Sequence, residues 1–204
     1  KETPRGAPAV LLQHGLMDTA DAWIMDHPDE SPAFVLAREG YDVWLGNNRG
    51  NRYSRKHETM SPTDEAFWDF SWQEMADHDL PALINFVLDQ TSLSKISYIG
   101  HSQGNTQLFY ALSQPNTYQD KLNLFVALSP LTKLENTRSK LLLHLDDYYD
   151  WIVWYLKKKD VHEAFGYWWN VLFKIVCGTD LNFCTWTEGY FVTQHPDFDD
   201  ADRF

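Results

Sequence analysis

The sequence predicts an α/β fold in which a parallel sheet is covered by helices on both faces. Over the first 130 residues, short and nearly continuous apolar runs alternate with segments of helical periodicity. Beyond about residue 132, long amphipathic stripes replace this alternation, and five of the nine tryptophans lie there. We therefore expect two parts, an α/β core over residues 1–132 and a helical cap, or lid region, over residues 133–204.

The expected core elements follow one another in a regular order. Ser31, Pro32 and Gly40 are a helix start, a first-turn proline and a helix stop. Pro81 is expected to bend the helix that contains it. The apolar runs predict strands at 9–13, 41–46, 95–100 and 124–130, and the helical spacing predicts helices at 31–40, 72–90 and 103–114.

The second part shows two amphipathic stripes, over 145–156 and 165–176, and both predict helices. Cys177 and Cys184 are enough for one bridge but not for a disulfide framework. His144 and His162 lie on amphipathic helices next to these stripes, where a structural or exposed role is the expected one.

The net charge disfavours two classes of partner, and the hydropathy predicts neither a transmembrane helix nor a signal peptide. Seventeen basic against 29 acidic residues give a net charge of −12, which disfavours nucleic acid and anionic membrane surfaces as general partners. No run of 18 apolar residues predicts a transmembrane helix. The opening KETPRGAPAVLLQHG has no signal-peptide hydrophobic stretch, so we expect that the mature chain starts abruptly or that an N-terminal part precedes it.

The stretch YIGHSQG at 98–104 carries the strongest chemical signal. Ser102 stands between Gly100 and Gly104, at the junction of a predicted strand and a predicted helix. This is the context of a nucleophile elbow, in which the glycines make room for a sharp turn that presents the serine. In isolation the pattern also fits a simple turn, but at this junction it favours a nucleophilic serine.

A second motif supports the first. The strand LLQ ends in His14 and Gly15, where serine hydrolases of this kind place an oxyanion-hole loop. The expected donors to an oxyanion are the backbone N–H groups of Leu16 and Gln103. The alternative interpretation of His14-Gly15 alone is a strand-ending turn.

These motifs belong to a wider resemblance. The stretches 11–16, 40–57, 67–88 and 98–104 together resemble the acid lipase family of α/β-hydrolases, whose members include gastric, lysosomal acid and sterol ester lipases. The resemblance implies a partial α/β-hydrolase fold with a helical cap, hydrolysis of neutral lipid esters without a cofactor, and a lysosomal or secreted location. In family members with a cap disulfide, the residue that pairs with the match of Cys177 corresponds to Trp168 here. A bridge would then have to join Cys177 to Cys184.

Two polar clusters have a structural and a functional interpretation. The loop 47–57 carries Arg49, Arg52, Arg55 and Lys56, which would suit an anion site. We expect instead that its arginines bind carboxylates and carbonyl groups of neighbouring segments. Asp77–Asp79 resembles an acid–base or metal cluster, but no fourth ligand is suggested, so we expect a solvated helix face and no metal site.

The general base and acid for Ser102 are the missing part. On this fold the chain order is serine, acid, histidine, which makes Asp180 and His195 the candidates. We reject both, because the spacing before Asp180 is helical and 14 residues leave no room for a crossover between parallel strands. His101 should point away from Ser102. The acid and the histidine are therefore expected beyond Phe204, in a further part of the protein or on a second chain.

Two functions remain open from the sequence. The first is a serine esterase or lipase whose aromatic cap contacts a lipid interface. The second is a non-catalytic binding or assembly subunit built on a truncated lipase core, since a fold does not fix a function. The intact motif around Ser102 favours the enzyme.

Overall fold

The chain divides into two units, residues 1–132 and 133–204. A computed structural model describes residues 6–115, 118–133, 135, 143, 146–159 and 161–163. Each unit is described by itself. That the second unit is a helical cap remains a prediction.

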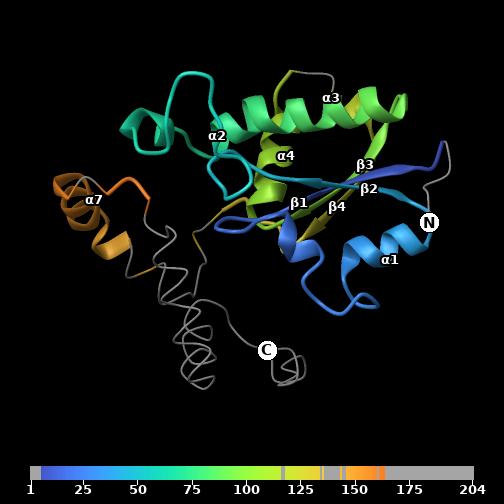
Figure 1. The fold of residues 1–204 in the computed structure, drawn as a ribbon, viewed down its shortest axis with the longest axis horizontal. Helices are drawn as coiled ribbons and strands as arrows, with labels where there is room; N and C mark the ends of the chain where they lie inside the picture. The colour runs from blue at the N-terminus through green and yellow to red at the C-terminus, as the bar shows by residue number, and fades with distance from the viewer. Residues whose placement is uncertain are drawn as a thin grey trace. The chain divides into compact units, whose positions relative to one another are not determined.

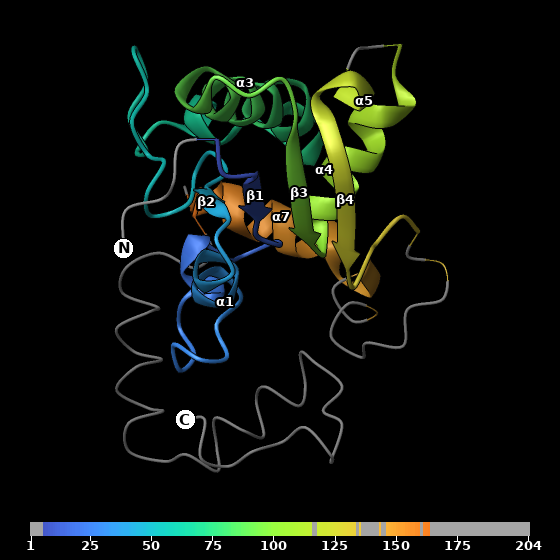
Figure 2. The same cartoon turned by 90° about the vertical axis from the view of Figure 1, so that its right-hand side faces the viewer.

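A four-stranded parallel sheet forms the centre of the first unit (Figure 2). Its spatial order is β2-β1-β3-β4, and every neighbouring pair is parallel. The strands are β1 (Ala9–Gln13), β2 (Asp42–Gly46), β3 (Ile96–His101) and β4 (Leu122–Leu128). The predicted α/β class is thus confirmed, although β4 begins and ends two residues earlier than expected.

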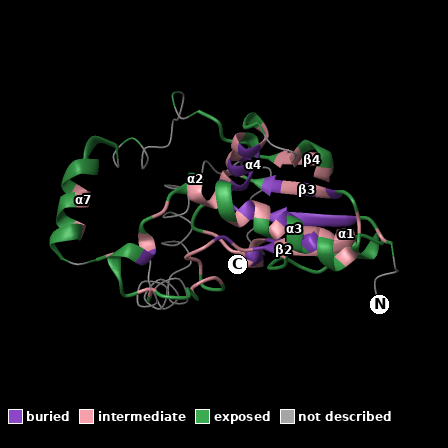
Figure 3. Cartoon of the chain, turned by 90° about the horizontal axis from the view of Figure 1, so that it is seen from above, coloured by how far each residue is buried: buried purple, intermediate pink, exposed green. Residues whose placement is uncertain are grey.

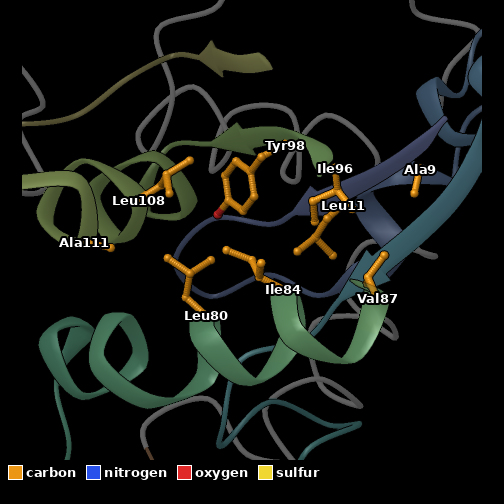
Figure 4. Close-up of a cluster of buried hydrophobic side chains, with 9 residues drawn as sticks. All are labelled: Ala9, Leu11, Leu80, Ile84, Val87, Ile96, Tyr98, Leu108 and Ala111. Carbon is orange, nitrogen blue, oxygen red and sulfur yellow. The ribbon is translucent and has the colours of Figure 1, made fainter. Parts of the chain in front are cut away.

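The sheet has a hydrophobic cluster on each face because side chains alternate along a strand. From β1, Ala9 and Leu11 join one cluster, whereas Val10 and Leu12 join the other. Figure 4 shows the first cluster, in which Leu11, Ile96 and Tyr98 of the sheet face side chains from two helices. Since β1 lies between β2 and β3, it is buried along its whole length (Figure 3).

Helices cover the two faces as the apolar strands require. Helix α1 (Pro32–Arg38) lies on one face, and α3 (Leu80–Thr91) and α4 (Gln103–Ser113) lie on the other (Figure 1). Ser31 precedes α1 as expected, but its hydroxyl donates to the Asp26 carbonyl (2.7 Å) and does not cap the helix. Gly40 follows α1 with φ at +93°, a conformation that glycine adopts readily.

The segment expected as one bent helix is three consecutive pieces. Helix α2 (Trp72–Glu74) leads into the π-helical turn η3 (Met75–Asp79), and α3 follows. Pro81 has no N–H to donate into an α-helical ladder, and the amide of Leu80 donates to the Met75 carbonyl, five residues back. The proline therefore comes directly after a π-turn where we expected a simple bend.

Three short elements have no periodic signal in the sequence. They are the 3-10 turns η1 (Ala20–Trp23) and η2 (Glu65–Trp68) and the one-turn helix α5 (Tyr118–Lys121). Four residues are too few to show a hydrophobic period, so the spacing of apolar residues cannot predict such turns.

The outer edge of β4 is unpaired among the residues that the structure describes. Leu124 is 57% exposed and Leu128 is 41% exposed. An apolar strand with free backbone groups along one side is a surface that another strand can pair with.

In the second unit the structure describes helix α7 (Tyr149–Lys158). This helix confirms the predicted stripe over 145–156 in part. The stripe at 165–176, both cysteines, Asp180 and His195 lie outside the described residues. In the described part of the chain, no helix is long and apolar enough to cross a membrane.

Truncation of a buried side chain of α3 should destabilise the protein far more than truncation of an exposed one. Ile84 is fully buried in the first cluster, so Ile84→Ala should lower the free energy of unfolding by about 2–5 kcal/mol in urea denaturation. Gln90→Ala, at an exposed position of the same helix, should change it by less than about 0.5 kcal/mol. Equal effects would contradict the packing of α3 on the sheet.

Candidate active site

The parallel strands place their following loops at one edge of the sheet. Gln13 pairs with both Gly46 and Gly100, and His101 pairs with Leu128. The segments that begin at His14, Asn47, Ser102 and Ser129 therefore leave the sheet side by side. In open parallel sheets, ligands bind at this carboxyl edge.

Ser102 occupies the strained turn that the sequence predicts. It lies between β3 and α4 with φ at 48° and ψ at −114°, far from the backbone conformations that residues other than glycine prefer. Such a conformation costs on the order of 1–3 kcal/mol and persists only where the surroundings enforce it. The predicted strand–turn–helix context of Ser102 is thus confirmed.

The two motif glycines are required by close backbone approach. A Cβ atom on Gly104 would lie 2.7 Å from the carbonyl oxygen of Gln13 and 2.9 Å from that of His14. A Cβ atom on Gly100 would lie 2.5 Å from Oδ1 and 3.0 Å from the backbone nitrogen of Asn105. The first turn of α4 therefore packs directly on the end of β1, with no room for a methyl group.

Buried hydrogen bonds hold the turn, and sequence reasoning missed the residues that make them. The Leu128 carbonyl accepts from the Ser102 amide (3.1 Å) and from Nδ2 of Asn105 (2.6 Å). The fully buried Tyr98 hydroxyl donates to the Gly104 carbonyl (2.8 Å), and burial raises the pKa of Tyr98. Asn105 is next to the motif, but nothing in the sequence around it indicates that its amide is buried or bonded to Leu128.

The His14–Leu16 loop lies beside Ser102. A Cβ atom on Gly15 would lie 3.1 Å from the Ser102 Cβ and 3.2 Å from Nδ1 of His101. The amides of Leu16 and Gln103 donate no hydrogen bond within the described part of the chain. Their convergence on one point near the Ser102 hydroxyl remains a prediction.

His14 is almost completely buried, and both of its ring nitrogens have partners. Nδ1 lies 2.8 Å from the Gly15 carbonyl, and Nε2 lies 3.2 Å from both the Asn48 amide and Nδ2 of Asn51. Burial lowers the pKa of His14 below its ordinary 6.5 and outweighs the opposite effects of the Gly15 bond and the Asp18 carboxylate. The ring is therefore neutral at pH 7.

Arginines of the basic loop bind carboxylates, as expected. The Arg49 amide and Nε donate to Asp79 (2.9 and 2.8 Å), and Arg52 Nη2 lies 2.8 Å from Asp21. Asp77 and His78 are exposed, as a solvated helix face requires. Asp79 departs from that expectation, because its mostly buried carboxylate is paired with Arg49.

No hydrogen bond to the Ser102 hydroxyl occurs among the described residues. A pocket of about 300 Å³ lies elsewhere, between the segments around Arg49–Met60 and Ala66–Phe70. None of the residues that line it belongs to the elbow or the His14–Leu16 loop, so we assign it no part in the chemistry of Ser102.

Comparison with known proteins agrees with this geometry. A family model described as the alpha/beta hydrolase fold matches residues 8–167, and the chain belongs to this family. It is similar to human lipase member K (49% identity over 65% of this chain and 33% of the relative) and to rat gastric triacylglycerol lipase (51%, 66% and 34%). Lysosomal acid lipase/cholesteryl ester hydrolase of Macaca fascicularis is 45% identical over 63% of this chain and 32% of its own length. The resemblance to acid lipases is thus confirmed, and the chain spans about a third of the length of these relatives.

A methyl group at the elbow should disturb the loop beside it. Gly104→Ala should move α4 away from β1 and destabilise the protein by about 1–3 kcal/mol. In a ¹H–¹⁵N NMR spectrum, the amide signals of His14, Gly15 and Ser102 should shift. In the control Gly40→Ala, the added Cβ has no atom within 4 Å and costs only backbone strain. The amide signals of the same three residues should keep their positions in this variant. Unchanged signals in Gly104→Ala would contradict the close approach.

The buried neutral ring of His14 should make stability depend on pH. The unfolded chain binds a proton near pH 6.5, whereas the folded ring binds it only at lower pH. The resulting stabilisation is fully present above about pH 6.5 and is lost as the pH falls through the folded pKa. In urea unfolding between pH 7.5 and 4.5, His14→Gln should flatten this decline, and the surface variant Gln90→Ala should not.

Proposed function

We propose that the full-length protein is a serine hydrolase of lipid esters, with Ser102 as its nucleophile. The observation that carries the proposal is the strained elbow of Ser102 at the carboxyl edge of a parallel sheet. Strained backbone that the surrounding structure enforces clusters at active sites. The lipase relatives supply the reaction class.

The reaction begins when Ser102 Oγ attacks the ester carbonyl and its proton passes to a general base. The carbonyl oxygen becomes an oxyanion, which the amides of Leu16 and Gln103 stabilise. The C–O bond to the alcohol then breaks, and the alcohol leaves with the proton from the base. Water attacks the acyl-serine in the second half, releases the fatty acid and restores the Ser102 hydroxyl.

The general base and its carboxylate come from outside residues 1–204 in this proposal. No described side chain hydrogen-bonds to the Ser102 hydroxyl, and the relatives are about three times as long as the stretch they share with this chain. The missing groups lie in a further part of the protein or on a second chain. No cofactor is required, because the donors and the nucleophile are protein groups.

The substrates proposed are neutral lipid esters, either triglycerides or sterol esters. Helix α7 supports contact with a lipid interface, because Trp151 and Trp154 are more than half exposed. Trp151 stacks on Tyr155 (5.6 Å between ring centroids), and Lys158 lies over the Trp154 ring (4.8 Å), which gives aromatic groups next to basic ones. A lysosomal or secreted location follows the names of the relatives.

Removal of the nucleophile tests the proposal. In the full-length protein, Ser102→Ala should lower turnover of p-nitrophenyl butyrate on the order of 10⁴–10⁶-fold. Ser92→Ala removes another serine with positive φ, at the end of α3, and should leave the rate unchanged. Residues 1–204 alone should be inactive, since in this proposal the base comes from outside them.

Three results would contradict this assignment. Turnover that survives Ser102→Ala would remove the serine from the mechanism. Turnover by residues 1–204 that is abolished by His195→Ala would place the whole triad within this chain. A folded but inactive full-length protein would favour the alternative, a non-catalytic binding or assembly subunit.

A further inference from the structure

His14 has one neutral tautomer that satisfies its surroundings. Its Nε2 faces the backbone amide of Asn48, and a backbone N–H can only donate, so Nε2 must be the acceptor. The ring proton therefore lies on Nδ1, which donates to the Gly15 carbonyl at 2.8 Å. Two bonds to backbone groups thus fix both the ring and its proton.

The Nδ1 bond also fixes the direction of an amide. The Gly15 carbonyl and the Leu16 N–H belong to one planar trans peptide group, so they point in opposite directions. Whatever holds the carbonyl toward His14 therefore holds the Leu16 N–H away from it. That N–H has no partner among the described hydrogen bonds, and Gly15 lies directly beside Ser102.

Asn51 is the side chain that holds the other end of the imidazole. Its Nδ2 lies 3.2 Å from His14 Nε2 and donates to Asn47 Oδ1 at 2.7 Å. Its Oδ1 accepts from the backbone amides of Tyr53 (3.0 Å) and Ser54 (3.2 Å), which identifies the oxygen end of the carboxamide. Both donors and the acceptor oxygen of Asn51 are therefore used.

The same group of asparagines reaches the far end of the loop after β1. Asn47 Oδ1 accepts from the backbone amide of Ala20 at 3.0 Å. The segment His14–Ala20 is thus held at its start by Asn48 and Asn51 and at its end by Asn47. The mostly buried Arg49–Asp79 pair in turn fixes this asparagine-bearing loop to the start of α3.

We infer that Asn51, acting through the neutral imidazole of His14, is a positioning residue that aims the Leu16 N–H at the oxyanion formed on Ser102. The inference rests on the proposed function, which it deepens. Asn51 touches neither the substrate nor Ser102. Together with the Asn48 amide, its Nδ2 donor keeps His14 Nε2 in its acceptor state and so keeps the 15–16 peptide in one orientation. Asp18 and His101 lie near this loop, and neither bonds to the ring. Asp21, at the end of the loop, is paired with Arg52 and accepts from the Tyr53 hydroxyl.

The test is Asn51→Asp in the full-length protein. This change keeps the shape and the acceptor oxygen but replaces the Nδ2 donor by an oxygen, which faces the acceptors on His14 and Asn47. An oxyanion donor acts on the transition state, and its loss costs about 10²–10³ in kcat. We expect kcat for p-nitrophenyl butyrate to fall by about 10- to 100-fold with KM changed less than twofold. Asn85→Asp, on α3, keeps the oxygen that accepts from Lys121 and should match the wild type.

A ring measurement separates positioning from general destabilisation. In ¹⁵N NMR of wild-type protein at pH 7.5, His14 should be neutral with its proton on Nδ1. In Asn51→Asp the new carboxylate attracts the proton of the neutral ring to Nε2, which leaves Nδ1 as an acceptor that repels the Gly15 carbonyl. The carboxylate should also raise the pKa of His14, and a protonated ring regains the Nδ1–H at low pH. The pH profile of kcat should change with it, which a merely structural lesion would not cause.

The outcomes are distinct. A wild-type ring protonated on Nε2 overturns the inference even if the variant fails to fold. An active wild type with an equally active Asn51→Asp overturns it while leaving the proposed function intact. An inactive, folded wild type overturns the proposed function and the inference with it.

Discussion

The close approach of α4 to the end of β1 is the constraint on which the rest of the site depends. The backbone of Gly104 lies against the carbonyl oxygens of Gln13 and His14, so the chain must reverse sharply between β3 and α4. Ser102 absorbs this reversal in its unfavourable φ and ψ. The same contact brings the loop after β1 beside the serine, because His14, the first residue of that loop, lies against the first turn of α4. One packing contact therefore produces both halves of the candidate site.

Buried amides hold this arrangement in place of charges. Four carboxamide side chains are nearly or fully buried, those of Gln13, Asn48, Asn105 and Gln107. Each has one bonded end and one buried atom without a partner among the described residues, but a carboxamide has no net charge to desolvate. Such groups can fix loop directions without adding a field that would oppose negative charge at Ser102. The charged pairs Arg49–Asp79 and Arg52–Asp21 act further out, where they hold the loop as a whole.

The sequence was sufficient for elements whose signal is local. Strand β1 matched its predicted bounds, and the elbow followed from Gly100, Ser102 and Gly104, because periodicity and motif spacing are properties of short segments. The π-turn before Pro81 could not be predicted from the spacing of apolar residues. The early start of β4 could not be predicted either, because the strand follows α5 without an intervening loop and includes the polar Asn123. The roles of Tyr98, Asn105 and Asn51 were also missed. Asn51 lies 37 residues from His14, and Asn105 lies 23 residues from Leu128, so nothing in their own neighbourhoods indicates these contacts.

The exposed margin of β4 affects how the polypeptide behaves when it is concentrated. Seven residues, LNLFVAL, present backbone groups that pair with no other described strand, together with two exposed leucine side chains, and they contain neither proline nor a charged residue. Segments of this composition self-assemble through strand addition and form stacked, fibril-like aggregates when nothing covers them. A segment that paired with β4 would therefore also protect against aggregation, and a lesion that displaced it would appear first as lost solubility.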